Sequence, residues 1–360
     1  MNDLSREDRP AGEAPADGLR ARRGRQVQAF FALLLALSLL ALALFVASLV
    51  VGPAEISVRE ALGALLFAPS TDREAQLAAV MWEIRLPRAL LGFMIGATLG
   101  LAGAALQGYL RNPLAEPGVI GVGASASLGA VLAIHTGLSA AFALALPVMG
   151  IAGALAAVAL VQALAGRGSD AVTLILAGVA VSSVAGALTA LVLNLSSNPF
   201  AALEILYWML GSLQDRSMVH VALAAPFMLL GWALLAGLGR ALDALTLGED
   251  AAASMGVRLS LVRSCAVFGT AASVGAATAV AGAIGFVGLV VPHLLRPLVG
   301  GQPSRLLAAS ALGGGAMILA ADLAVRLLAP GRDLKLGVLT ALVGAPFFFW
   351  LIWKHRRSLA

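Results

Sequence analysis

The stretch that decides the fold runs from residue 83 to residue 118 and reads EIRLPRALLGFMIGATLGLAGAALQGYLRNPLAEPG. Arg85 and Arg88 stand near its start, and a long apolar run rich in small residues follows them. The run ends at a second charged cluster, Arg111-Asn112-Pro113. An α-helix needs roughly 20 apolar residues to cross a bilayer. The stretch therefore predicts a transmembrane helix over residues 88–109 with arginines at both ends.

The composition of the whole chain agrees with a membrane location. Of the 360 residues, 60% are hydrophobic and only 12% are charged, and the mean hydropathy is +0.94. A soluble domain needs a more polar surface. The apolar runs are continuous and do not alternate, which disfavours a β-barrel. The sequence thus predicts an all-α polytopic membrane protein whose ten helices form one bundle, over residues 27–51, 88–109, 118–136, 140–165, 171–194, 219–238, 261–281, 284–300, 305–325 and 336–353.

An even number of spans places both termini on the same side of the membrane. Residues 1–26 are polar and end in an arginine cluster, so we expect a disordered tail in the cytoplasm. The apolar run that follows is too long for a signal-peptide core. The expected organisation is a tail over 1–26, a transmembrane domain over 27–355 and a cytoplasmic C-terminal tail over 356–360.

The distribution of basic residues tests this topology. Most of the 24 lysines and arginines fall on its cytoplasmic side, as the positive-inside rule requires. We attribute the net charge of +5 to this bias and to anionic lipid, and not to nucleic acid. The basic residues that break the rule are Arg59, Arg73, Arg85, Arg88, Arg216, Arg326, Arg332 and Lys335.

Small residues recur at every fourth position of two predicted helices, which places them on one helix face and allows close packing. These residues are Gly92, Gly96, Gly100, Ala104 and Gly108 in one helix, and Gly178, Ser182, Gly186 and Ala190 in another. Two connections also predict short helices. Residues 196–217 carry Tyr207 and Trp208 for the outer interface, and residues 239–263 form a cytoplasmic segment broken at Gly248 and Gly256.

The chain lacks the motifs of an enzyme. Its two lysines, Lys335 and Lys354, do not follow a phosphate-binding glycine loop, so no Walker A motif is present. The four histidines have no paired metal-ligand spacing, and the one cysteine, Cys265, is expected to pack in the core. The sequence indicates a transport pathway without its own energy source and with no cofactor or metal of its own.

Four stretches of the sequence resemble the FecCD-type permeases, which serve bacterial ABC importers of vitamin B12, haem and ferric siderophores. They cover about residues 83 to 350 in the family's order. They read RLPRALLGFMIGATLGLAGAALQGYLRNPLAEPGVIGVGASASLGA, WMLGSL, LGEDAAASMGV, and GFVGLVVPHLLRPLVGG with AADLAVRLL and DLKLGVLTALVGAPFF after it.

The resemblance implies a type II ABC importer permease fold in the bacterial inner (plasma) membrane. It further implies a homodimer with the pathway on its two-fold axis, two cytoplasmic ATPase subunits that bind ATP and Mg, and a periplasmic substrate-binding protein. The chain would then be a non-catalytic subunit whose helices change access when the ATPases close.

The resemblance also assigns site residues. Arg85, Arg88 and Arg326, with Arg332 and Lys335, would dock carboxylates of the binding protein, a task that suits guanidinium groups. The alternative is that they anchor helix ends at the membrane surface. A coupling loop against the ATPase would use Gly248, Glu249, Ala252, Met255 and Gly256, with a merely solvated loop as the alternative. Arg111, Asn112 and Pro113 would end a helix, and Pro292 and His293 would shape another.

The sequence departs from the family at one place and leaves the ligand open. The family usually has Glu-Leu-Pro before the tenth helix, whereas this chain has Asp333-Leu334-Lys335. Among ligands, a ferric siderophore ranks first, haem second and cobalamin third. A secondary transporter would need ionisable groups or broken helices in the membrane. Asp322 and Glu204 are the candidate ionisable groups. A membrane-embedded enzyme would need a cluster of catalytic side chains.

Overall fold

The computed structural model describes residues 16–52, 54, 56–142, 144–166, 171–329 and 334–356. Every regular element in these ranges is a helix. Each of the ten expected spans overlaps one of the main helices, which are α1 (Ala16–Val50), α4 (Leu86–Tyr109), α5 (Val122–His135), α7 (Ala145–Ala165), α8 (Ala171–Leu195), α10 (Met218–Ala236), α13 (Leu259–Ala281), α14 (Val287–Leu295), α15 (Pro303–Leu328) and α16 (Leu336–Arg356).

Seven helices in the described ranges are long and apolar enough to cross a membrane. The others, α5, α14 and α16, are shorter or have shorter apolar stretches. Short helices join the main ones: α2 (Val58–Leu66), α3 (Asp72–Ala79), α6 (Leu138–Ala141), α9 (Pro199–Met209), α11 (Gly239–Leu245) and α12 (Glu249–Ser254). Three further turns are η1 (Val80–Arg85), η2 (Pro117–Ile120) and η3 (Pro297–Val299).

Two helices begin earlier than the hydropathy suggests. The first helix starts at Ala16, so it includes the part of the expected tail from that residue onward. Alanine, leucine and arginine dominate this part and favour helix. The second span continues a longer helix over residues 72–109, in which the π-helical turn η1 joins α3 to α4. Hydropathy marks where a helix enters lipid, and a helix can extend beyond that point.

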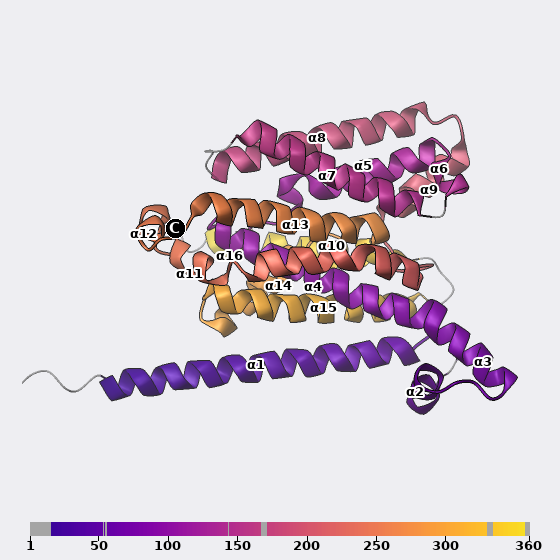
Figure 1. Ribbon diagram of the computed structural model, residues 1–360, viewed down its shortest axis with the longest axis horizontal. Coiled ribbons are helices and arrows are strands. Elements are labelled where there is room, and N and C mark those ends of the chain that lie inside the picture. Colours follow the sequence, from indigo (N-terminus) through magenta and orange to yellow (C-terminus); the bar gives the residue numbers. More distant parts are fainter. Residues whose placement is uncertain are drawn as a thin grey trace, which may run out of the picture.

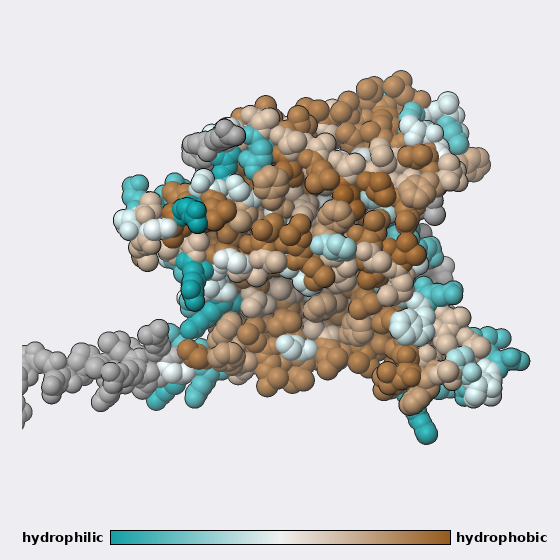
Figure 2. All heavy atoms as spheres, in the orientation of Figure 1, coloured by the Kyte–Doolittle hydropathy of each residue, from teal (hydrophilic) through white to brown (hydrophobic). Residues whose placement is uncertain are grey.

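The main helices lie side by side along one direction (Figure 1). We name the two ends of the bundle after the short helices found there, the α12 end and the α2 end. Hydrophobic residues cover the middle of the visible surface, and hydrophilic residues gather at both ends (Figure 2). This distribution matches a bundle that spans a bilayer with its ends in water.

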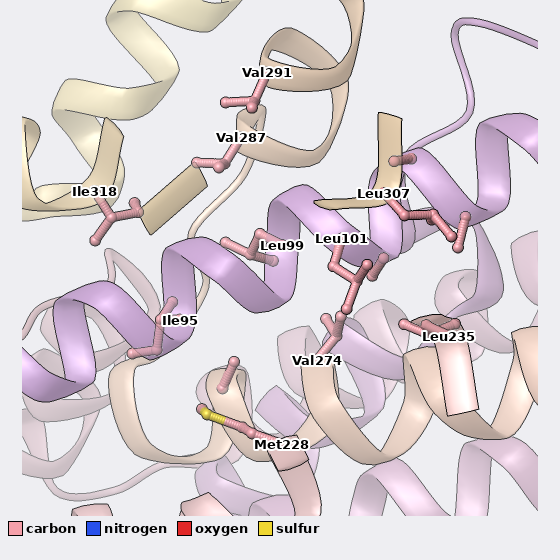
Figure 3. Packing of buried hydrophobic residues seen from close by; sticks show 14 of the residues in the cluster. Ile95, Leu99, Leu101, Met228, Leu235, Val274, Val287, Val291, Leu307 and Ile318 are labelled. Atoms are coloured by element: carbon pink, nitrogen blue, oxygen red, sulfur yellow. The ribbon is translucent and has the colours of Figure 1, made fainter. Parts of the chain in front are cut away.

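Helix α4 is the centre of the core. Seventeen of its 24 residues are buried, including Gly96 and Gly100. Its side chains lie between those of α14 and α15 on one side and those of α10 and α13 on the other (Figure 3). The labelled residues are Ile95, Leu99 and Leu101 of α4, Met228 and Leu235 of α10, Val274 of α13, Val287 and Val291 of α14, and Leu307 and Ile318 of α15.

Glycines bring α4 and α15 into backbone contact. A Cβ atom added to Gly96 would overlap the carbonyl oxygen of Gly314, and one added to Gly100 would overlap that of Ser310. A Cβ added to Gly103 would overlap the carbonyl of Gly288 in α14. The stripe of small residues that the sequence places on this helix therefore sets how closely its neighbours approach.

Two connections run inside the bundle as extended or turn segments. Residues 110–121 follow α4, and residues 282–286 separate α13 from α14. Because these segments occupy part of the depth, α5 and α14 need only 14 and 9 residues. Hydropathy finds the apolar residues of such segments but does not show that their backbone leaves the helix.

We predict that Gly96→Ala lowers the free energy of unfolding in detergent by about 1–3 kcal/mol, because its methyl group has no room against α15. The matched control is Gly63→Ala in α2, where no atom lies within 4 Å of the added Cβ. The control should be neutral or slightly stabilising, since alanine favours helix over glycine. Thermal unfolding curves of both variants measure the difference, and equal curves would contradict the close approach.

Candidate functional site

The expected docking arginines lie at the α2 end of the bundle. Arg85 ends η1, and only 5% of its surface is exposed. Its guanidinium donates to the carbonyl oxygens of Leu49 at 2.7 Å, Val50 at 2.6 Å and Ala54 at 2.5 Å. These carbonyls stand at and just after the end of α1, where no intrahelical donor is available. Arg85 therefore caps the first helix in this conformation.

Arg88 and Arg326 share one carboxylate. Nε and Nη2 of Arg88 donate to Oδ1 of Asp322 at 3.0 and 2.8 Å, and Nε also approaches Oδ2 at 3.1 Å. Arg326 lies one turn after Asp322 on α15 and also donates to it. It reaches α1 as well, through the Ser48 carbonyl and hydroxyl, both at 2.8 Å, and the Val51 carbonyl at 3.0 Å.

We call Arg85, Arg88, Arg326 and Asp322 the arginine cluster. It joins the end of α1 to α4 and α15, and Arg88 and Arg326 share its one carboxylate, whereas Arg85 binds only carbonyl oxygens. The exposed fractions of the side chains are 19% for Arg88, 10% for Arg326 and 2% for Asp322. The cluster thus has an excess of positive charge close to the surface.

The remaining docking candidates are Arg332 and Lys335. Arg332 lies outside the described residues, as does Asp333. Lys335 precedes α16, and its ammonium group stands 5.4 Å from the centre of the Tyr207 ring, a cation–π distance. Trp208, which the sequence placed beside Tyr207 at an interface, is buried.

The expected coupling loop lies at the α12 end. Helices α11 and α12 are the two short helices predicted there, and the chain breaks at Gly248 and Gly256, whose φ angles are 106° and 85°. Met255 is 63% exposed and Glu249 is exposed, whereas Ala252 is fully buried. The segment is therefore a folded protrusion with an apolar anchor and an exposed tip.

The helix-end motif stops α4 and reaches this protrusion. Arg111 has a left-handed φ of 48°, and the N–H of Asn112 donates to the Gln107 carbonyl at 3.2 Å, as in a Schellman C-cap. The Asn112 side chain accepts from the N–H of Leu114 at 2.9 Å. The Arg111 guanidinium lies 3.7 Å from Glu249. The pair is half exposed, so it orients the two segments with little energy.

Asp243 is a site residue that the sequence analysis missed. It lies in α11, and its carboxylate accepts from the N–H of Ser304 at 2.8 Å and from the Gln302 amide at 2.9 Å. It therefore caps the N-terminus of α15, where a negative charge is favourable. The partners are some 60 positions apart, so no local pattern announces this contact. Through it, the segment that forms the protrusion contacts the helix that carries Asp322.

Glu116 was missed as well. Its Oε1 accepts from the N–H of Phe286 at 2.7 Å, at the start of α14. Nearby, Gln107 donates to the carbonyls of Ala115 and Gly288, at 3.3 and 3.2 Å, and accepts from Arg296 at 2.7 Å. These bonds hold residues 110–121, the segment after α4, against residues 282–286 and the start of α14. In the sequence, Glu116 is a carboxylate in a short apolar segment between Pro113 and Pro117. This pattern does not show how deep in the bundle the carboxylate lies.

The other candidates give no constellation. Glu204, named for a secondary transporter, is exposed on the short helix α9. His293 stacks edge-on against Phe347 with ring centres 5.6 Å apart, which agrees with a packing role. In the part of the chain that the structure describes, no group of three or more histidine, cysteine, aspartate or glutamate side chains is placed to bind a metal ion.

The comparisons identify the class of protein. Residues 39–354 match the model of the FecCD transport family. The Fe(3+) dicitrate transport system permease protein FecD of Escherichia coli is 39% identical over 277 residues, which cover 77% of this chain and 86% of that protein. The vitamin B12 import system permease protein BtuC of Salmonella typhi is 38% identical over 295 residues, which cover 81% and 88%.

A solved structure shares the fold. It is an inward-facing conformation of a metal-chelate type ABC transporter, with a TM-score of 0.78 and 32% sequence identity, and the match covers 89% of this chain and 98% of that chain. A bundle of this kind, with a folded protrusion at one end, defines a multi-pass permease of an ABC transporter. The chain belongs to the FecCD transport family, which confirms the family resemblance and the fold class predicted from the sequence.

We predict that Asp322→Asn lowers the free energy of unfolding by about 3–5 kcal/mol, because it leaves two largely buried guanidiniums without their carboxylate. The control Arg73→Gln removes an exposed pair with Glu60 and should leave stability unchanged. Denaturation of both variants in detergent measures the difference. If Asp322→Asn unfolds like the parent, the cluster does not stabilise the end of α1.

Proposed function

We propose that the chain is the membrane subunit of an ATP-driven importer that moves a bulky metal chelate from the periplasm to the cytoplasm. It works in the bacterial inner membrane as a homodimer with both termini in the cytoplasm. Two ATPase subunits and a periplasmic binding protein complete the transporter, and ATP and Mg are bound by the ATPases. The chain itself performs no chemistry and changes access between the two sides.

The observation that carries this proposal is the folded protrusion at the α12 end. A loop that only connects two helices needs no buried anchor, yet Ala252 is fully buried while Met255 and Leu247 are 63% and 68% exposed. Exposed apolar side chains on a polar, structured segment are typical of a protein contact. The contact of Asp243 with the start of α15 gives a route by which a pull on the protrusion would move a membrane helix.

The arginine cluster supports docking of an acidic partner at the other end. Its excess positive charge would attract carboxylates of a binding protein, and Arg88 has the most exposed of the three guanidiniums. The Arg85 guanidinium is bonded to carbonyls at the end of α1, so in this conformation it holds that end of α1 in place beside the other two arginines. We propose Arg332 and Lys335 as further docking residues, as the family resemblance implies.

The homodimer is supported by surfaces that one copy leaves open. On α8, Gly186 and Ala190 of the small-residue stripe are exposed, whereas Gly178 packs against the Val119 carbonyl. Exposed small residues in a membrane helix permit close approach of another helix. The ligand remains ranked as before, with a ferric siderophore first, then haem, then cobalamin. Relatives named for ferric dicitrate and for vitamin B12 are consistent with this class.

Uptake of labelled ferric siderophore, haem and cobalamin by cells with and without this gene tests the proposal. We predict that the deletion abolishes uptake of one ligand. Glu249→Arg and Gly256→Trp in the protrusion should reduce the same uptake at least about tenfold, because they alter its charge and its left-handed turn.

The matched control is Leu298→Ala, an exposed position of η3 near the start of α15 that lies outside the protrusion. It should transport like the parent. Membrane content of every variant is measured by immunoblot. If the two loop variants are present and transport normally, the coupling assignment is wrong.

A further inference from the structure

Residues 282–286 leave peptide groups unsatisfied inside the bundle. Among the described residues, the N–H groups of Ala283, Ile284 and Gly285 donate no hydrogen bond, and the Phe286 N–H is bonded only by Glu116. Ala283 is exposed and the next three residues are half exposed. This is backbone that neither a helix nor the surrounding protein satisfies.

The segment runs from the start of α16 into the membrane. The Ala283 carbonyl lies against Gly337, one residue after the start of α16. Phe286 lies against Gly344, eight residues or about 12 Å after the start of α16. Gly288, at the start of α14, lies against Gly103, six residues or about 9 Å before the end of α4. The start of α14 is therefore distant from both ends of the bundle.

Lipid cannot cover such a segment. The hydrocarbon core offers no hydrogen-bond partner, and irregular backbone at this depth occurs where protein covers it or where water fills a cavity. The carboxylate of Glu116 adds a second constraint, because an ionisable group at this depth faces the protein interior or an aqueous pathway. Its Oε1 caps Phe286, and the structure gives its other oxygen no partner within the described ranges.

Open space adjoins this carboxylate. A Cβ atom added to Gly285 would meet only Oε1 of Glu116, at 3.8 Å, and one added to Gly118 would meet nothing within 4 Å. Gly118 is exposed and belongs to the other internal segment, two residues after Glu116. The two segments thus leave room beside the same charged group.

We propose that residues 283–286, Glu116 and Gly118 line the water-filled transport pathway, from the level of the start of α16 toward the middle of the membrane. Water in the pathway satisfies the free N–H groups, and Glu116 gives this part of the wall a negative charge. The charge favours cationic groups over anionic ones. This inference rests on the proposed function, because it assigns the pathway of the same transporter.

Thiol accessibility tests the proposal in the complete transporter in membrane vesicles. The background is Cys265→Ala, which removes the one cysteine. Gly285→Cys and, separately, Gly118→Cys are exposed to a cationic and an anionic methanethiosulfonate from either side. Both should react at least about tenfold faster than Leu39→Cys, an exposed position of α1, because a thiol in lipid does not form the reactive thiolate.

The charge of Glu116 gives a second readout. Gly285→Cys should react faster with the cationic reagent, and Glu116→Gln should abolish that preference while it retains an acceptor for the Phe286 N–H. A role in capping alone would leave the preference unchanged.

Two results would overturn the proposal. One is reaction of both thiols as slow as that of Leu39→Cys. The other is crosslinking of two chains at residue 285 without reaction in water, which would show a dry contact between copies. If either occurs while uptake still requires ATP, only the pathway assignment fails. If uptake by the Cys265→Ala background does not require ATP, the proposed function fails.

Discussion

The close approach of α4 and α15 is the constraint on which the structure depends. The two helices meet through Gly96 and Gly100 of α4 and Ser310 and Gly314 of α15. A Cβ atom added to Gly96 or to Gly314 would overlap the backbone of the other helix. In lipid, helices associate through packing and not through the hydrophobic effect, so such contacts carry much of the stability. Because α4 is also the centre of the core, its contact with α15 fixes the frame around which α10, α13 and α14 pack (Figure 3).

Helix α15 also connects the two ends of the molecule. At the α12 end, Asp243 of α11, beside the folded protrusion, caps its N-terminus. At the α2 end, Asp322 and Arg326 join it to α4 and to the end of α1. A rigid helix with polar contacts at both ends gives a physical route between the folded protrusion and the arginine cluster. The half-length helix α14 lies beside it, so that movement of α15 would act on the internal segments around Glu116.

The sequence predicted the ten segments, the break points at Gly248 and Gly256, and the stripe on α4, because each depends on local composition or spacing. It did not predict the contacts that join distant segments. Asp243 and Glu116 act on partners roughly 60 and 170 positions away, and nothing nearby marks them. The sequence marked Arg85, Arg88 and Arg326 as exceptions to the positive-inside rule. It did not show that Arg85 binds carbonyls of α1 or that Arg88 binds Asp322. Exceptional charges are visible in a sequence, whereas their partners follow from the fold.

The most direct test of the account is the energy source of transport in proteoliposomes. The chain is reconstituted with its ATPase subunits, the binding protein is added, and uptake of the ligand is measured with ATP or with an imposed ion gradient. The account predicts uptake that requires ATP hydrolysis and does not change when every gradient is collapsed. Uptake driven by a proton or sodium gradient without ATP would contradict it and identify a secondary transporter.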